Sequence, residues 1–259
     1  MEKLTLVKIG GAILDDEVRL DSFLKLFAQL KGKKILVHGG GKTATKLSEK
    51  IGLNPEMVKG RRITDAEMLK VVTMVYAGLT NKTVIARLQG FKVNALGLTG
   101  ADGNVLIAEK RPVTDIDFGY VGDITEANVN TDFLKGLLDQ EITPVFSAIT
   151  HDGSGQLFNT NADTIAATLA VAMTRYFEAE LVYCFEMKGV LKDVKDQNSV
   201  ISVLNEANFN SFVEQKLIAE GMIPKITNAL EAVKKGVSRV IIKSAEDLPD
   251  DSAGTIIIK

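Results

Sequence analysis

The sequence has little of what secreted and membrane proteins depend on. It contains one cysteine, Cys184, in an apolar stretch. A single thiol excludes an intrachain disulfide and favours a reducing compartment. No apolar run approaches the roughly 18 residues that a membrane helix requires. A strand-like run begins at Leu4 and leaves no room for a signal peptide. We therefore expect a cytoplasmic protein with no membrane partner.

An excess of charge of one sign is also missing. The chain carries 31 Lys and Arg residues against 33 Asp and Glu residues, without a block of like charges. Nucleic acids bind to concentrated positive charge, so we expect no nucleic-acid partner. With 259 residues, 46% of them hydrophobic, the chain is long enough for one large domain or two smaller ones. We expect two lobes, the second beginning near Ala179.

Apolar runs of β-type composition alternate with segments that carry a helical stripe. This alternation predicts βαβ units and a mainly parallel sheet. Thr64 and Glu67 form a capping-box pattern, which predicts that a long helical region begins there and continues to about Gln89. Two short antiparallel pieces are expected at residues 105–108 and 119–124. The expected strands cover residues 4–9, 34–38, 93–98, 144–149, 181–185, 240–242 and 255–258, and the expected helices cover residues 21–30, 42–51, 131–139, 162–176 and 224–235.

A glycine triplet, Gly39 to Gly41, follows the second strand, and this arrangement is typical of an anion site. The stretch from Gly39 to Ala44 matches the dinucleotide pattern, but the acidic residue expected about 20 positions later at a strand end is missing. The missing acidic residue argues against a dehydrogenase. A phosphate-binding P-loop would need glycine at Leu36, and no G-x-S-x-G motif of a serine hydrolase occurs.

Two lysines occupy unusual positions. Lys8 lies between Val7 and Ile9 at the end of the first strand, where open α/β sheets place their ligands. Lys225 lies at the start of a helix, where the dipole disfavours a cation unless an anionic ligand is present. Arg62 has the planar fork that grips a carboxylate. Without a credible His, Cys or Ser nucleophile, this inventory favours phosphoryl transfer, and a carboxylate acceptor would need no general base.

Seven motifs spread in order over nearly the entire chain resemble those of the acetylglutamate kinases, a family of the amino acid kinase superfamily. Each motif is weak, but seven in sequence make a specific match. They are Lys8-Ile9-Gly10-Gly11, His38-Gly39-Gly40-Gly41, Gly60-Arg61-Arg62-Ile63-Thr64, Gly97-Leu98-Thr99-Gly100-Ala101-Asp102-Gly103, Gly119-Tyr120-Val121-Gly122, Asn159-Thr160-Asn161-Ala162-Asp163 and Gly221-Met222-Ile223-Pro224-Lys225.

The resemblance implies an α/β fold, an open αβα sandwich with a mainly parallel central sheet and two lobes. Residues 1–178 would bind the acyl-glutamate and dimerise, and residues 179–259 would bind ATP. The implied reaction is ATP-dependent phosphorylation of the side-chain carboxylate of N-acetyl-L-glutamate to an acyl phosphate, the activated intermediate of ornithine and arginine synthesis. Mg²⁺ would be bound mainly through the ATP phosphates, with no protein ligand assigned.

The resemblance also implies roles for individual residues. Lys8 and Lys225 would stabilise charge on the transferred phosphoryl group, and Asp163 would orient both lysines. Gly10 and Gly11 would donate N–H groups to the nucleotide phosphates, beside Lys225. The residues implied in holding the acyl-glutamate are Gly40, Gly41, Arg62 and Asn159.

Two departures from the family pattern affect these expectations. Phe185-Glu186 replaces the usual Ser/Thr-Asp at the end of the second lobe's first strand, which puts the nucleotide pocket in question. The chain also starts directly at its first strand, without the N-terminal helix of arginine-inhibited hexamers, so we expect a homodimer that is insensitive to arginine. N-succinyl-L-glutamate, another carboxylate or amino acid kinase, and an NAD-dependent dehydrogenase remain alternatives. The presence of both Lys8 and Lys225 argues against a non-catalytic regulatory protein.

Overall fold

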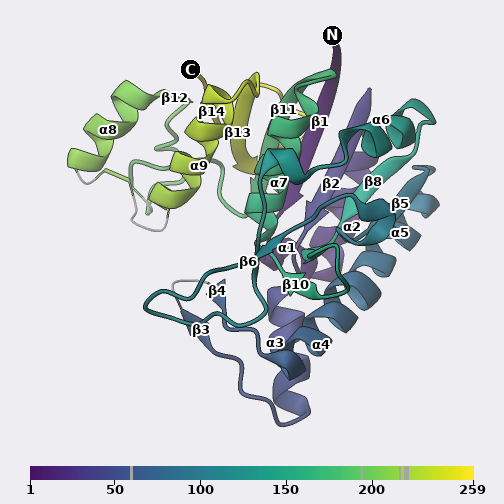
Figure 1. Cartoon of the computed structure of the whole chain (residues 1–259). Helices are drawn as coiled ribbons and strands as arrows, with labels where there is room; N and C mark the ends of the chain where they lie inside the picture. The colour runs from purple at the N-terminus through teal and green to yellow at the C-terminus, as the bar shows by residue number, and fades with distance from the viewer. Residues whose placement is uncertain (59–60, 194, 216, 219–221) are drawn as a thin grey trace.

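The structure is a computed structural model that describes residues 1–58, 61–193, 195–215, 217–218 and 222–259. Within these residues the centre is an eight-stranded sheet in the order β12-β14-β13-β11-β1-β2-β8-β5 (Figure 1). Neighbouring strands are parallel except for β13 and β14. The strands are β1 (Glu2–Ile9), β2 (Lys33–His38), β5 (Ala95–Leu98), β8 (Thr143–Phe146), β11 (Phe177–Phe185), β12 (Val203–Leu204), β13 (Arg239–Ser244) and β14 (Thr255–Ile257).

Helices cover both faces of this sheet, which confirms the predicted αβα sandwich. One face is covered by α2 and α5, and the other by α4, α6, α7, α8 and α9. The α-helices are α1 (Gly11–Leu14), α2 (Glu17–Gln29), α3 (Gly41–Lys50), α4 (Ala66–Thr73), α5 (Asn81–Gly90), α6 (Thr131–Asp139), α7 (Ala162–Met173), α8 (Glu206–Glu214) and α9 (Ile223–Lys234).

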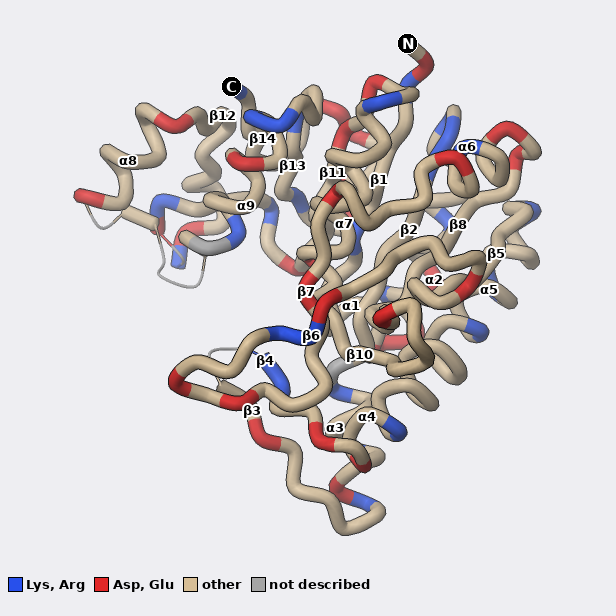
Figure 2. The backbone as a smooth tube through the Cα atoms, viewed as in Figure 1, with Lys and Arg blue, Asp and Glu red and all other residues tan. Residues whose placement is uncertain are grey.

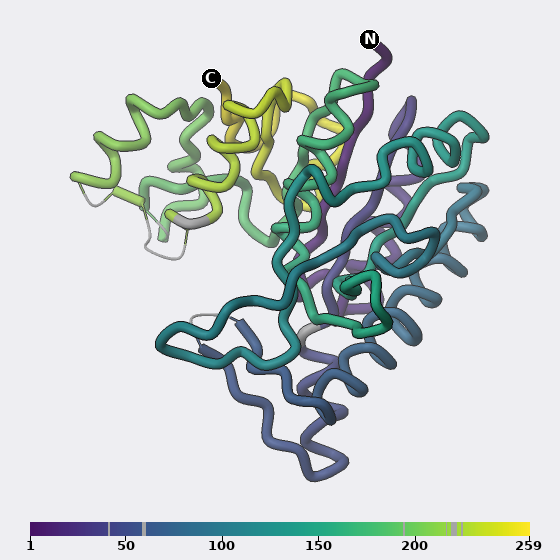
Figure 3. Tube along the Cα trace, in the orientation of Figure 1, coloured from purple at the N-terminus to yellow at the C-terminus, as the bar shows by residue number. Residues whose placement is uncertain are grey.

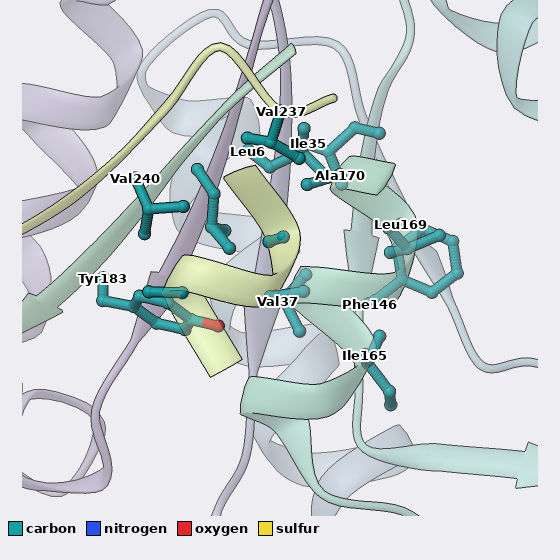
Figure 4. Close-up of a cluster of buried hydrophobic side chains, with 14 of the residues drawn as sticks. Leu6, Ile35, Val37, Phe146, Ile165, Leu169, Ala170, Tyr183, Val237 and Val240 are labelled. Atoms are coloured by element: carbon teal, nitrogen blue, oxygen red, sulfur yellow. The ribbon is translucent and has the colours of Figure 1, made fainter. Parts of the chain in front are cut away.

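Alternation along the strands divides the core into two layers. Leu6 and Val37 belong to the same buried cluster as Ile165 and Ala170 of α7 (Figure 4). Val7 and Leu36, one residue along, point to the opposite face and join the core under α2. Successive side chains of a strand alternate between faces, and parallel sheets bury both. This burial explains why the strands read as nearly continuous apolar runs.

The predicted long helical region is present but begins differently. The cap is Asp65, whose side chain accepts a hydrogen bond from the Met68 N–H at 2.7 Å. The predicted capping box at Thr64 is therefore wrong, because the Thr64 hydroxyl donates to the Arg62 carbonyl instead. Between α4 and α5 the chain forms a π-helix, η1 (Met74–Thr80).

Hairpins and loops extend beyond the carboxyl ends of the strands. The hairpin of β3 (Met57–Val58) and β4 (Arg61–Arg62) lies beside the loop between β6 (Glu109–Lys110) and β7 (Gly122–Asp123) (Figure 3). Two backbone hydrogen bonds join these segments, one from the Thr64 N–H to Phe118 and one from the Tyr120 N–H to Thr64. A third hairpin pairs β9 (Ile149–His151) with β10 (Leu157–Asn159), and single 3₁₀ turns occur at η2 (Asp102–Asn104), η3 (Glu126–Asn128) and η5 (Ala245–Asp247).

Most of the expected segments form the predicted elements, and α6 has the predicted bounds. The strand expected at residues 144–149 ends at Phe146, because Ile149 begins the β9–β10 hairpin. Residues 105–108 form only isolated bridges, and the antiparallel pair consists of β6 and β7. The expected lobe boundary at Ala179 lies inside β11, so the sheet is continuous across it.

Lys and Arg residues are interspersed with Asp and Glu residues along the described backbone, as Figure 2 shows. Among the described helices, none is long and apolar enough to span a membrane.

Candidate active site

Two glycine turns meet at the carboxyl edge of the sheet. Gly10 and Gly11 follow β1, and the Gly39 to Gly41 triplet follows β2. Ile9 and His38, the last residues of these two strands, are register partners in the parallel ladder. The turns are therefore neighbours, and a pocket adjoins each of them.

The first pocket, called the lysine pocket here, is a cavity of about 300 Å³ beside the Gly10–Gly11 turn. Lys8, Gly10, Gly11 and Lys225 all line it, so the structure brings together four of the residues that the sequence indicated. The Gly10 N–H donates to the Cys184 carbonyl at 3.0 Å. A Cβ on Gly11 would meet only the Asp15 carboxylate, at 3.9 Å, so a ligand can approach this backbone closely.

Lys8 and Lys225 face the same aromatic ring. Their ammonium nitrogens lie 5.3 Å and 3.9 Å from the Phe185 ring centroid, and the ring stacks on Tyr183. Both distances lie within the range of a cation–π attraction. Burial lowers the pKa of Lys225, while Asp163 acts in the opposite direction and Lys8 adds to the lowering.

Asp163 provides the negative charge between the two lysines. Its Oδ1 lies 2.7 Å from the Lys8 ammonium nitrogen, and its carbonyl accepts from the Tyr183 hydroxyl at 3.2 Å. It lies in the first turn of α7, where Asn161 is the cap and accepts from the Thr164 N–H at 3.0 Å. A carboxylate at this end of a helix also meets the dipole favourably.

The second pocket, called the arginine pocket here, is a cavity of about 170 Å³ beside the Gly39 to Gly41 turn. Gly40, Arg62 and Asn159 line it, as do Arg61 and Arg111. Gly41 is the first residue of α3. Three guanidinium groups make this pocket suited to carboxylate ligands.

Local packing fixes the predicted residues of the arginine pocket. The buried Arg62 donates from Nη2 to the Thr45 hydroxyl at 2.8 Å, and its Nη1 lies 3.9 Å from the Met68 sulfur. The Asn159 amide donates to the Thr64 hydroxyl at 3.0 Å. A Cβ on Gly40 would lie 2.7 Å from Cδ1 of Tyr76, so the ring fits only against glycine.

Comparison with known proteins identifies the family. The model described as the amino acid kinase family matches residues 3–244. An acetylglutamate kinase of Phocaeicola vulgatus is 52% identical over 258 residues, which are 100% of this chain and 99% of the relative. That of Cytophaga hutchinsonii is 53% identical and covers 96% and 94%. The chain belongs to the acetylglutamate kinases, within the amino acid kinase family.

The same fold occurs in a solved structure of N-acetylglutamate synthase from Neisseria gonorrhoeae, complexed with coenzyme A and N-acetyl-glutamate. Its TM-score is 0.81 at 25% identity, over 100% of this chain and 59% of that chain. As an acetylglutamate kinase, the chain is a phosphotransferase with a carboxyl group as acceptor. The dehydrogenase alternative is not favoured.

Several residues of this acetylglutamate kinase's pockets were not found by sequence reasoning. Tyr76 and Arg111 lie outside the seven motifs, and only the folded chain brings them together. Arg111 forms a bidentate ion pair with Asp123. Phe185 was noticed only as a departure from the family pattern. Of the seven family motifs, Gly60 and Gly221 lie outside the described residues.

Proposed function

We propose that the protein transfers the γ-phosphoryl group of ATP to the side-chain carboxylate of N-acetyl-L-glutamate, forming an acyl phosphate for arginine biosynthesis. One observation carries the assignment of the site. The lysine pocket and the arginine pocket adjoin neighbouring strand ends, with the Lys8–Asp163 ion pair of 2.7 Å at that edge. A donor in one pocket and a carboxylate in the other would meet beside two cations.

The reaction requires that the two substrates are positioned and that the charge on the transferred phosphoryl group is neutralised. A carboxylate oxygen of the acceptor forms a bond to the γ-phosphorus, while the bond from that phosphorus to the bridging oxygen of the β-phosphate breaks and ADP leaves. The acceptor is already ionised at pH 7, so no base has to remove a proton. Lys8 and Lys225 would stabilise the charge on the transferred group, and Asp163 would hold Lys8 in place.

Each pocket is proposed to take one substrate. Gly10 and Gly11 are proposed to form the turn that faces the ATP phosphates next to Lys225. The Gly11 N–H would donate to these phosphates, whereas the Gly10 N–H already donates to the Cys184 carbonyl at 3.0 Å. Gly40 and Gly41 would line the acyl-glutamate, and Arg62 with Asn159 would bind its α-carboxylate region. The positions of Gly40, Arg62 and Asn159 in the lining of the arginine pocket support this proposal. Residues 1–178 would accordingly bind the acyl-glutamate and dimerise, and residues 179–259 would bind most of the nucleotide.

Mg²⁺ is proposed to enter with ATP. Within the described part of the chain, no group of three or more His, Cys, Asp or Glu side chains is placed to hold a metal ion. Mg²⁺ commonly keeps several waters and binds through substrate phosphates. The protein's part would be to place those phosphates against Lys8, Lys225 and the Gly10–Gly11 turn.

The experiment that tests this function is an ATP-dependent hydroxamate assay on N-acetyl-glutamate, N-succinyl-glutamate, glutamate and aspartate. N-succinyl-glutamate is included because its acyl group adds a carboxylate, and Arg61 and Arg111 line the arginine pocket. N-acetyl-glutamate is expected to give the product, and no hydroxamate from any acceptor would overturn the kinase assignment.

Lys8→Ala tests the site within the same assay. Turnover should fall by about 10² to 10³, the scale of losing one preorganised charge-stabilising group, with the melting temperature nearly unchanged. Lys3→Ala, on the exposed start of the same strand, is the control that should keep normal turnover. Near-normal turnover of Lys8→Ala would show that Lys8 contributes to packing and not to catalysis.

We also propose that the protein is a homodimer, and an exposed apolar surface supports this proposal. Met74 and Leu79 on η1 and Leu96 on β5 are large apolar side chains that are exposed, and β5 is the end strand of the described sheet. Exposed apolar groups next to an open sheet edge suit a second copy of the chain. We expect Leu79→Asp to sediment as a monomer. Val18→Asp, on α2, is the control that should remain dimeric. A monomeric wild type would contradict the proposal.

The cytoplasmic location and the insensitivity to arginine stay predictions. The second is checked by measuring hydroxamate formation with arginine added at millimolar concentration, where unchanged turnover is expected.

A further inference from the structure

A fully buried histidine stands directly before the glycine turn of the arginine pocket. His38 is the last residue of β2 and has no exposed surface. Its Nδ1 lies 2.8 Å from the Gly39 carbonyl oxygen, and its Nε2 lies 3.0 Å from the side-chain nitrogen of Asn81. Both ring nitrogens are therefore engaged, and neither is available to a substrate.

The partners of Asn81 fix the direction of these bonds. The Asn81 side-chain nitrogen also donates to the Val145 carbonyl of β8, at 3.0 Å. A carbonyl can only accept, so the amide nitrogen must face β8 and His38, and Nε2 must accept from it. The Gly39 carbonyl then requires that Nδ1 carries the proton. The ring is neutral at pH 7, because burial lowers the pKa of His38 to about 4.

The π-helix determines where Asn81 lies. Asn81 follows η1 directly, and Tyr76 is inside η1. In an α-helix, two residues five positions apart differ by about 140° around the axis, at 3.6 residues per turn. A π-helix closes its hydrogen bond between such residues, so they lie nearly above one another. Tyr76 can therefore pack on Gly40 while Asn81 reaches His38.

We propose that Asn81 and His38 are positioning residues, which hold the glycine turn of the arginine pocket in the shape that binds the carboxylate acceptor. The hydrogen bond from Asn81 to His38 Nε2 anchors the turn to β8, and η1 with the first residue of α5 places Tyr76 and Asn81 on the same side. The inference rests on the proposed function, since it takes the arginine pocket to be the acceptor site. Neither residue touches the reacting atoms.

The proposal predicts a change confined to one substrate. His38→Leu keeps an apolar side chain of similar size but leaves the Asn81 amide without its acceptor. The KM for the acceptor should rise about tenfold, as expected for one lost buried hydrogen bond, while the KM for ATP stays within about twofold. His38→Gln retains an oxygen that accepts from Asn81 and should recover most of the acceptor affinity.

Asn81→Ala provides an independent arm if His38→Leu does not fold, with the same rise in acceptor KM expected. Thr83→Ala is the matched control, because Thr83 lies on the same helix and its exposed hydroxyl bonds only the Leu79 carbonyl. Equal rises in both KM values, or identical behaviour of His38→Leu and His38→Gln, would mean that the pair is only structural and would overturn the proposal.

A second readout does not depend on turnover. In ¹⁵N-labelled wild type, the His38 ring should show the neutral form with the proton on Nδ1 between pH 6 and pH 8. A ring protonated on Nε2 would contradict the geometry. Failure of the proposed function is distinguished by the wild type itself, which would then give no hydroxamate. Failure of this inference shows in an active wild type whose variants have an unchanged acceptor KM, equal rises in both KM values, or no difference between His38→Leu and His38→Gln.

Discussion

At the scale of single residues, the lowered pKa of Lys225 makes a prediction about pH. Burial favours the neutral amine, and only the ammonium form can stabilise phosphoryl charge. The kcat/KM for ATP, which reports groups of the free enzyme, should therefore fall as pH rises, with its midpoint below the ordinary lysine pKa of 10.5. Lys225→Arg should move this alkaline limb to higher pH, because guanidinium stays charged. An unmoved limb would assign the titration to another group.

Gly40 and Gly39 form a matched pair for testing the arginine pocket. Gly40 has φ +159°, and an added Cβ would lie 2.7 Å from Tyr76. The Cβ of Gly39→Ala would meet only the Ala162 methyl, at 4.0 Å. We expect Gly40→Ala to raise the KM for the acceptor about tenfold or more, by the clash and the strained backbone, and Gly39→Ala to change it much less. Steady-state kinetics in the two substrates decides, and equal effects of both changes would contradict this account.

The sequence predicts site residues where a side chain does not suit its local structural context. A lysine within an apolar strand and a lysine at a helix start are two such cases, and the structure places Lys8 and Lys225 in one pocket. Tyr76 and Arg111 gave no such signal. A tyrosine in a helical stripe and an arginine in a polar loop are ordinary, and their place follows from the packing of segments distant in sequence.

At the scale of elements, Lys34 of β2 caps the carboxyl-terminal end of α2. Its buried ammonium donates to the carbonyls of Phe27, Ala28 and Leu30 at 2.8, 3.0 and 2.9 Å. These carbonyls belong to the last turn and cap of α2, where a helix runs out of its own N–H donors. The Phe27 carbonyl also accepts from the Leu30 N–H at 3.2 Å. We expect Lys34→Met to lower the free energy of unfolding by about 1–3 kcal/mol, because buried acceptors lose their donor.

Urea unfolding measures this effect, and Lys31→Met, in the exposed loop just before β2, is the control that should leave the midpoint nearly unchanged. A stabilised Lys34→Met variant would show that desolvation of the ammonium, which lowers its pKa to about 8, outweighs its three hydrogen bonds.

Elements were predictable by type more than by boundary. Strands buried on both faces and amphipathic helices leave strong patterns, so the layers follow from the sequence. The helix start does not follow from the sequence, because Asp65 and Thr64 are both good caps. In the structure Asp65 caps the helix, and the Thr64 hydroxyl donates to the Arg62 carbonyl and accepts from the Asn159 amide. The π-helix was also missed, since residues such as Met74 and Val75 suit an α-helix equally well.

At the scale of the whole molecule, the parallel sheet was predictable from the βαβ rhythm but the strand order was not. β11 pairs with β1 across more than 160 residues of chain, and β14 joins β13 antiparallel. Such pairings depend on how complete layers pack, and local composition carries little of that information. The adjacency of the two pockets has the same origin, because it follows from β1 and β2 being neighbours.

The buried neutral His38 makes the stability of the whole molecule depend on pH. Its pKa is about 4 in the folded protein against an ordinary value of 6.5, so between these values the unfolded chain binds the extra proton. Stability from this residue is complete above pH 6.5 and is lost as pH falls toward 4, by up to about 3 kcal/mol for a shift of this size. In urea titrations, His38→Gln should show a shallower decline than wild type between pH 7 and pH 4.5. His151→Gln, which leaves His38 in place, should keep the wild-type decline, and parallel curves for all three proteins would contradict a buried neutral His38.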